Sequence, residues 1–476
     1  MKQNQINTSE SAPKRIVCLT SNLAEDWPSL RAWCKKHPAL SVLLWSLVKV
    51  DGDLARSVRS ELDGGELKCG DWAVDSLCAE PALVSTLREG LHAAAPDCVL
   101  VPSADDSRGR AALQDRNALC WAGLSALSLG PARVVHMVRP GGRFNGVRNR
   151  PLDSRRALTK WRKRMQPDGG TPSVTAVVST WNKAEDVCAN LEALQAQVEP
   201  FDDIVVVDNQ SSDDTAVRLR DRFPHVRLVI MPNSDYGACE TFNIGFSCAL
   251  TDCTAILDDD VVLPPDWLAL SKARMQEEPA STAVVSTKIV EPGMPEAYKN
   301  SDEINTERYM STFRGCASLA RTKALTEAGG YDERLFIYGN ERDLTCRFLN
   351  LGYRVLQYPK AIAYHKTPFG IKMGKRSLYF HARNAWLSML KYAPAGDLAR
   401  MPIQVVRKVL MRSGSQETSG EISDATGTIG IGRSLRETPG AWWVVTKAAL
   451  SVAANIPYCL KHRKAVKSPD FELPLD

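Results

Sequence analysis

The chain has 476 residues, of which 44% are hydrophobic and 24% are charged. This composition excludes wholesale disorder, and the length predicts about three domains. The net charge of +5 is concentrated, because ten Lys/Arg and one acid (Asp153) lie between Arg139 and Arg164. The rest of the chain is therefore net acidic. The overall positive charge is no evidence for a nucleic-acid partner, and no nucleic-acid-binding motif accompanies the basic stretch, so we expect none.

The cysteine content and the composition of the first residues indicate the cellular compartment of the protein. Thirteen cysteines without a Cys-x-x-Cys pair predict reduced thiols, and the hydrophilic first residues have no apolar core of a signal peptide. Residues 442–460 are interrupted by Lys447, Asn455 and Pro457, which predicts an amphipathic or buried helix and not a membrane span. We expect a cytoplasmic protein, with peripheral attachment to the inner face of the membrane as an open alternative.

The first 138 residues alternate short apolar runs with helical patterns. Strands are predicted at 15–20, 40–50 and 98–102, and helices at 80–95 and 111–128. This alternation predicts a Rossmann-like α/β domain whose role is unknown. Its segment around Asp105 and Asp106 resembles sugar N-deacetylases of the LmbE type. No histidine lies near Asp105 to complete a zinc site, so we expect a non-catalytic relative.

The remaining chain divides into three parts. Residues 139–172 are predicted to be a basic linker, with Pro and Gly clusters near its ends. A second alternation, over 173–395, predicts a central α/β domain. Its strands are predicted at 174–180, 203–209, 226–232 and 254–260, and its helices at 183–197, from 212, and at 237–249. Residues 396–476 are predicted to be a basic helical extension, with helices at 404–411 and 442–460 around a loop at 413–432.

Polar side chains follow three of the central strands at the point where each strand ends. Asp258, Asp259 and Asp260 end one strand, Asp208 and Asn209 end another, and Thr180 and Asn182 follow a third. Ligands of open α/β sheets bind beyond the carboxyl ends of strands, so these groups predict a shared site. Three adjacent carboxylates repel one another, and this cost is tolerable where a cation or a hydrogen-bonding ligand offsets it. Without the other two strand ends, the three acids could equally form a solvent-exposed acidic turn that precedes a helix.

In order and spacing, residues 173–392 resemble family 2 glycosyltransferases of the GT-A fold, of the rhamnosyl- and galactofuranosyltransferase-like type. The matching segments are 177–182 (VVSTWN), 207–215 (VDNQSSDDT), 233–245, 258–260 (DDD), 329–344, 352–365 and the Arg383-Asn384 pair. Asn340 replaces an acid of the usual Glu-Asp-x-Asp segment, and Glu341 stands where the catalytic Asp usually stands.

The resemblance implies roles for individual residues. The nucleotide-sugar would be held by Thr180, Asn182, Asp208, Asn209, Gly237, Asn243, Asp258 and Asp259. Mn²⁺ or Mg²⁺ would be held by Asp258, Asp260 and His365, and would stabilise the departing diphosphate. Glu341 would be the general base, with Asp343 orienting it or the acceptor.

The implied function is metal-dependent, inverting transfer of a sugar from a nucleoside diphosphate to a hydroxyl. The acceptor would be a glycan or a lipid-linked molecule, in the synthesis of cell-surface polysaccharide. An anionic membrane surface is a further expected partner of the basic linker and tail. Two alternatives stay open at this point: a non-catalytic, glycosyltransferase-like scaffold, and a protein that both deacetylates and glycosylates.

Overall fold

A computed structural model describes residues 171–231, 234–249, 251–369, 374–405 and 439–472, together with short segments nearer the N-terminus. Those segments are 15–20, 27–28, 31, 41–46, 52–61, 66–69, 98–102 and 134–138.

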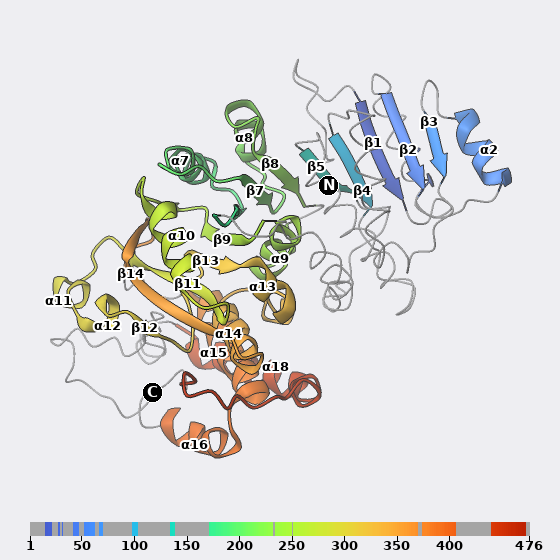
Figure 1. Cartoon of the computed structure of the whole chain (residues 1–476). Helices are drawn as coiled ribbons and strands as arrows, with labels where there is room; N and C mark the ends of the chain where they lie inside the picture. The colour runs from blue at the N-terminus through green and yellow to red at the C-terminus, as the bar shows by residue number, and fades with distance from the viewer. Residues whose placement is uncertain are drawn as a thin grey trace.

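One mixed sheet runs through these residues (Figure 1). Its order is β10-β14-β11-β13-β9-β6-β7-β8-β5-β4-β1-β2-β3, and β12 pairs with β14. The strands of the central part are β6 (Val174–Thr180), β7 (Asp203–Asp208), β8 (Arg227–Ile230), β9 (Cys253–Asp258), β10 (Val261–Val262), β11 (Thr282–Val290), β12 (Arg308–Tyr309), β13 (Ala317–Arg321) and β14 (Arg354–His365). Strands β9, β6, β7 and β8 are parallel, whereas β13 is antiparallel to β9 and β11. The predicted α/β class and the four predicted central strands are confirmed.

The strands nearer the N-terminus extend this sheet. They are β1 (Arg15–Thr20), β2 (Ser41–Ser46), β3 (Glu66–Cys69), β4 (Cys98–Pro102) and β5 (Val134–Val138). All their pairings are parallel, and β5 joins β8. The sequence predictions identified β1, β2 and β4 but missed β3, β5 and α2 (Gly52–Glu61). The predicted helices at 80–95 and 111–128 and the Asp105 segment lie outside the described residues, so the Rossmann-like and deacetylase-like readings stay predictions.

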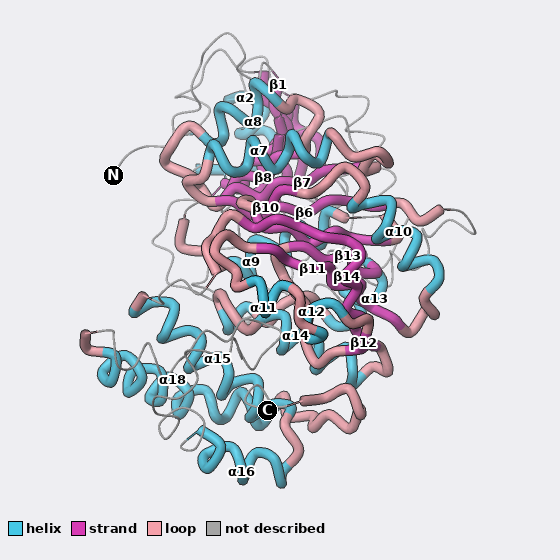
Figure 2. The backbone as a smooth tube through the Cα atoms, turned by 90° about the vertical axis from the view of Figure 1, so that its left-hand side faces the viewer, coloured by secondary structure: helices cyan, strands magenta, loops and turns pink. Residues whose placement is uncertain are grey.

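Helices cover both faces of the central strands (Figure 2). The helices of this part of the chain are α7 (Ala184–Gln195), α8 (Thr215–Arg222), α9 (Ala238–Cys248), α10 (Trp267–Glu277), α11 (Glu296–Lys299), α12 (Asp302–Asn305), α13 (Thr322–Ala328), η1 (Glu333–Leu335), α14 (Asn340–Asn350), α15 (Lys375–Tyr392), α16 (Ala395–Val405) and α18 (Ala441–Lys461), of which α15, α16 and α18 lie farther from the sheet. The predicted helix at 442–460 is confirmed as α18, whereas most of the helix predicted at 404–411 lies outside the described residues.

The alternation of side chains along β6 separates two apolar cores. Ala176 and Val178 belong to the core shared with α7, α8 and α10, which also contains the fully buried Trp267. Val177 belongs to the core shared with α9, α13 and α14, onto which α15 and α18 pack. Because successive side chains point to opposite faces of a strand, a short apolar run here supplies both cores. The strand ends are thereby fixed between two packed layers.

Candidate active site

The polar strand ends lie together at one edge of the sheet, as predicted. In the parallel register, Thr180 of β6 pairs with Asp208 of β7, and Ser179 pairs with Asp258 of β9. Val261 of β10 pairs with His365 at the end of β14. The carboxyl ends of β6, β7, β9 and β14 therefore lie close together, although Thr180 and His365 are far apart in the sequence.

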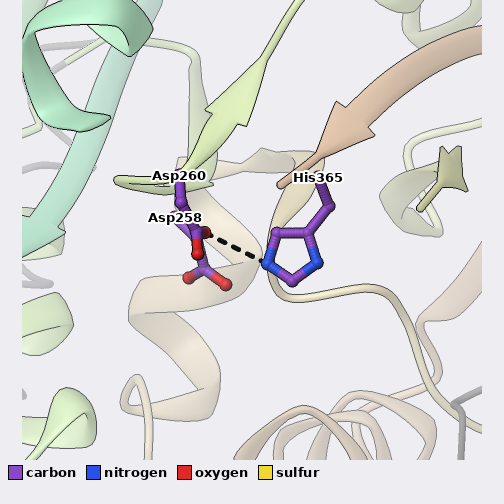
Figure 3. A group of neighbouring side chains, drawn as sticks. All are labelled: Asp258, Asp260 and His365. Atoms are coloured by element: carbon purple, nitrogen blue, oxygen red, sulfur yellow. Dashed lines mark ion pairs between the residues drawn. The ribbon is translucent and has the colours of Figure 1, made fainter. Parts of the chain in front are cut away.

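Asp258, Asp260 and His365 form a group that could hold a divalent cation (Figure 3). Each offers one ligand atom, and these atoms lie within 4.8 Å of one another. His365 Nε2 lies 3.1 Å from Asp260 Oδ1. Burial and the charge of Asp260 raise the pKa of Asp258 to about 6, so this carboxylate gains from a nearby cation. Two carboxylates and an imidazole suit Mn²⁺, and the carboxylates also suit Mg²⁺.

Glu291 orients the imidazole of His365. Its Oε1 lies 3.0 Å from His365 Nδ1, which leaves Nε2 directed at Asp260. Burial alone would lower the pKa of His365, but the hydrogen bonds with Asp260 and Glu291 raise it to about 10. A carboxylate behind a histidine ligand is a common arrangement in metal sites. The sequence predictions missed Glu291, which directly follows strand β11; Thr282, Ser286, Thr287 and Lys288 interrupt the apolar pattern of that strand.

Lys183 is a second residue that the sequence predictions missed. Its Nζ donates to Asp259 Oδ1 at 3.2 Å and to Asp260 Oδ2 at 2.8 Å. Burial would raise the pKa of Asp260, but hydrogen bonds from His365 and Lys183 outweigh burial and lower it. Lys183 therefore offsets part of the negative charge of the acidic strand end, and it shares Asp260 with His365.

Asp208 and Asn209 retain unused acceptors next to this group. Asp208 Oδ1 accepts hydrogen bonds from the backbone and hydroxyl of Ser211, and Asn209 Nδ2 donates to Tyr236 O at 2.9 Å. Asp208 Oδ2 and Asn209 Oδ1 are buried and have no hydrogen-bond partner among the described residues. Buried polar atoms without a partner are uncommon, and both could accept from the N–H groups of a nucleobase.

Three other predicted nucleotide-binding residues hold loops in place. Asn182 Oδ1 accepts from Ser212 N at 2.7 Å, which ties the end of β6 to the segment after β7. Asn243 Oδ1 accepts a hydrogen bond from Tyr331 N, and its Nδ2 donates to Tyr331 O and to Glu333. The amide of Asn243 is therefore bonded to the segment that contains Tyr331 and Glu333. A Cβ at Gly237 would lie 2.2 Å from the backbone oxygen of Phe336, so glycine allows that close packing. A contact of these three with a nucleotide stays a prediction.

Glu341 lies at the start of α14 and is half-buried. Asn340 Nδ2 donates to its Oε1 at 2.6 Å, and a Cβ at Gly315 would clash with the same oxygen. Burial raises the pKa of Glu341 to about 7, and the charge of Asp258 adds to this rise. A carboxylate with a pKa near neutrality can accept a proton at physiological pH, which suits a general base.

Asp343 lies in a different environment from Glu341, and its predicted role in orienting Glu341 or the acceptor stays a prediction. Its side chain has no exposed surface and pairs with Lys391 of α15 and with Arg347, at 3.2 Å. Lys391 also donates to Asp332 Oδ2 at 2.5 Å. Two residues apart on a helix, Glu341 and Asp343 point in different directions. The ion pair of Asp343 with Lys391 therefore anchors α14 to α15.

The segment before α14 is held in an unusual backbone conformation. Phe336 and Tyr338 have φ values of 68° and 67°, in the left-handed region that bulky residues rarely adopt. Asn384 of α15 donates to the backbone oxygens of Leu335, Ile337 and Tyr338, at 2.8–2.9 Å. These hydrogen bonds hold the conformation and thereby fix the start of α14, where Glu341 lies.

Comparison with known proteins agrees with this geometry. Residues 175–331 match the family model described as Glycosyl transferase family 2. The matched segment is similar to family 2 glycosyltransferases. It contains Thr180, Asp208 and the three acids of residues 258–260, whereas Glu341 and His365 follow it.

Two curated proteins are similar to this chain. A probable glycosyltransferase, YdaM, of Bacillus subtilis (strain 168) is 24% identical over 259 residues, which cover 50% of this chain and 60% of that protein. Galactofuranosyltransferase GlfT1 of Mycobacterium tuberculosis (strain ATCC 25618 / H37Rv) is 28% identical over 202 residues, which cover 38% of this chain and 66% of that protein. The chain thus spans less than two thirds of the length of either relative.

Two solved structures are also similar to it. Mannosyltransferase PcManGT from Pyrobaculum calidifontis, in complex with GDP-Man and Mn²⁺, has a TM-score of 0.38 and 18% identity, over 64% of this chain and 83% of that chain. Residues 1–349 of S. aureus TarS, in complex with UDP, have a TM-score of 0.39 and 16% identity, over 60% of this chain and 91% of that chain.

Proposed function

We propose that this protein is a metal-dependent, inverting glycosyltransferase that moves a sugar from a nucleoside diphosphate to a hydroxyl of a glycan or a lipid-linked acceptor. The observation that carries the proposal is the meeting of three groups at one sheet edge. These are the cation-binding group of Asp258, Asp260 and His365, the unpaired acceptors of Asp208 and Asn209, and the half-buried Glu341. The family 2 domain and the names of both curated relatives support the same class of reaction.

Each group has a separate part in the reaction. Asp208 and Asn209 would accept hydrogen bonds from the base, which positions the diphosphate toward the acidic strand end. Asp258, Asp260 and His365 would hold Mn²⁺ or Mg²⁺, which when bound offsets negative charge on the diphosphate. Lys183 would supply a further positive charge there, since its ammonium already bonds both Asp259 and Asp260.

Glu341 would activate the acceptor. It takes the proton of the acceptor hydroxyl while the hydroxyl oxygen forms a bond to the anomeric carbon of the donor sugar. The bond from that carbon to the diphosphate oxygen breaks, and the diphosphate leaves with the electron pair. A single displacement inverts the anomeric configuration. The pKa of about 7 lets Glu341 take a proton and later release it to water near neutral pH.

A nucleotide-sugar panel tests the proposal. The full chain would be incubated with UDP-, GDP- and dTDP-sugars, galactofuranose and mannose donors included, with Mn²⁺ or with EDTA. We expect release of the nucleoside diphosphate from at least one donor with Mn²⁺ and none with EDTA. If no donor turns over with Mn²⁺, the enzyme proposal fails, and the non-catalytic, glycosyltransferase-like scaffold is favoured instead. Transfer to cell-surface polysaccharide and a cytoplasmic location belong to the same proposal.

A further inference from the structure

Helix α18 has one face packed on the protein and one apolar face exposed. Ala441, Val444, Ala448 and Cys459 are buried, at a spacing that places them on one side of the helix. The opposite side carries large apolar residues that are 40–63% exposed: Trp442, Trp443, Leu450, Ile456 and Leu460. An exposed apolar surface of this size on one helix is unusual for a protein in water and commonly marks an interaction site.

By length and composition α18 could cross a bilayer, but its hydrogen bonds to the rest of the protein argue against a membrane-spanning orientation. Arg383 donates to Ser451 Oγ at 2.9 Å, and Arg334 donates to Asn455 Oδ1 at 3.0 Å. Tyr458 donates to Asp332 Oδ2 at 3.1 Å. The middle and the end of α18 are therefore bonded to charged groups of the protein, which a bilayer core would not accommodate.

Within α15 and α18, the two described helices that pack together here, the charged side chains are all basic. Lys447 Nζ lies 5.4 Å from the ring of Trp443, and the exposed Lys375 ends beside Gly440, just before α18. Trp and Lys together are typical of helices that lie at the boundary between water and lipid. A two-fold pairing of this face with a second copy would instead bring like charges together.

We infer that α18 lies flat on an anionic lipid bilayer, with Trp442, Trp443, Leu450, Ile456 and Leu460 entering the boundary between headgroups and acyl chains. Each exposed apolar side chain loses contact with water on docking, and Lys375 and Lys447 face the anionic headgroups. Burial of the apolar side chains and attraction of the cations act together at the N-terminal end of α18, where Trp442 and Trp443 lie beside Lys375 and Lys447.

Docking at α18 would place the catalytic segment close to the lipid. The guanidinium of Arg334 lies 3.9 Å from the ring of Tyr458 on the inner face of α18, and Arg334 precedes Glu341 by seven residues. The distance from bilayer to this segment is then about one helix diameter, roughly 10–12 Å. This last step rests on the proposed function: it favours an acceptor anchored in the lipid over a soluble glycan.

Vesicle flotation of the full chain tests the inference without any donor or acceptor. We expect the protein to float with phosphatidylcholine vesicles that contain phosphatidylglycerol and to stay unbound with phosphatidylcholine alone. The double variant Trp442→Ser/Trp443→Ser should lose roughly tenfold or more of the bound fraction, and high salt should weaken binding of the wild type. Val198→Ser, at a residue that is 74% exposed away from α18, is the matched control and should bind as the wild type does.

Three results would overturn the inference. The wild type could fail to bind anionic vesicles, or the double tryptophan variant could bind them as well as the wild type. The wild type could also form a dimer by light scattering that the double variant abolishes, with no vesicle binding, which would make the face a contact between copies. A thermal unfolding midpoint equal to that of the wild type confirms that the double variant is folded. Because flotation needs no turnover, its failure leaves the proposed sugar transfer standing.

Discussion

Glu291 Oε1 lies 3.0 Å from His365 Nδ1. Glu291, which directly follows β11, therefore holds the imidazole ring so that its Nε2 faces Asp260. Glu291→Ala should therefore weaken Mn²⁺ binding by roughly 10- to 100-fold, the usual effect of removing a residue behind a metal ligand. Calorimetric titration with Mn²⁺ measures this effect. Glu296→Ala, which removes an exposed acid that pairs only at the surface with Lys299, is the control. Equal affinity in Glu291→Ala and the wild type would contradict this role.

Lys183 should compete with a cation for the oxygens of Asp260. Lys183→Met removes the resident positive charge, so in the absence of nucleotide we expect Mn²⁺ to bind several-fold more tightly, by roughly 3- to 10-fold. Lys366→Met removes a charge of similar exposure (44% against 41%), but its partner is Asp186, so it controls for the general loss of charge. A Lys183→Met protein that binds Mn²⁺ no better than Lys366→Met would show that Lys183 does not compete.

Glu341→Gln should stabilise the protein at high pH while it removes activity. The pKa of Glu341 in the folded protein is about 7, above its ordinary value of 4.5, so the folded state holds the proton more tightly than the unfolded state. The contribution of Glu341 to the stability of the wild type therefore falls as pH rises from 4.5 through 7. Because Gln does not ionise, the variant should gain ~2 kcal/mol over the wild type between pH 4.5 and 8, allowing for the exposed part of the side chain.

Urea unfolding at the two pH values measures this gain, and sugar transfer should fall by roughly 10²- to 10⁴-fold in the same variant. A stability difference that does not change with pH would show that the Glu341 carboxylate is not held in its protonated form by burial. Transfer at the wild-type rate would remove Glu341 from the reaction.

The ion pairs between α14 and α15 should be essential for stability. Lys391 is 1% exposed and joins Asp332 and Asp343. Lys391→Met removes the buried cation that Asp332 and Asp343 share and leaves Asp343 with Arg347, so unfolding should require ~3–5 kcal/mol less free energy than in the wild type. Lys360→Met, at an exposed lysine of β14, should change the free energy of unfolding by less than ~0.5 kcal/mol. Similar unfolding midpoints for the two variants in urea would contradict a stabilising role of this cluster.

The central strands were predictable because short apolar runs with polar ends occur only where both faces of a parallel sheet are buried. Asp208, Asp258 and Asp260 could be found in the same way, since each follows such a run. The strand β11 was not predicted, and Glu291 was therefore missed together with it. Nothing in the sequence around Lys183 shows that its ammonium reaches Asp260, because this contact depends on how α7 packs beside β9.

Asp343 shows that a sequence motif does not by itself say which of its side chains face the same site. The charged segment at 340–343 resembles a family pattern in which each acid has a role at the site. In an α-helix, residues two apart lie on different sides, and here one side faces the sheet edge and the other faces α15. The helical period alone could have separated the two acids, whereas the identity of the partner, Lys391, depends on tertiary packing.

The most direct test of the proposed function is donor turnover by Asp260→Asn. Asp260 contacts His365, Lys183 and Thr367, and it belongs to the group that could hold the cation. With the donor identified by the nucleotide-sugar panel, release of nucleoside diphosphate would be measured for the wild type and the variant over a range of Mn²⁺ concentrations. We predict metal-dependent turnover in the wild type and a loss of at least about 10²-fold in Asp260→Asn. Equal turnover of the two proteins, or wild-type turnover that EDTA leaves unchanged, would contradict the assignment of this site.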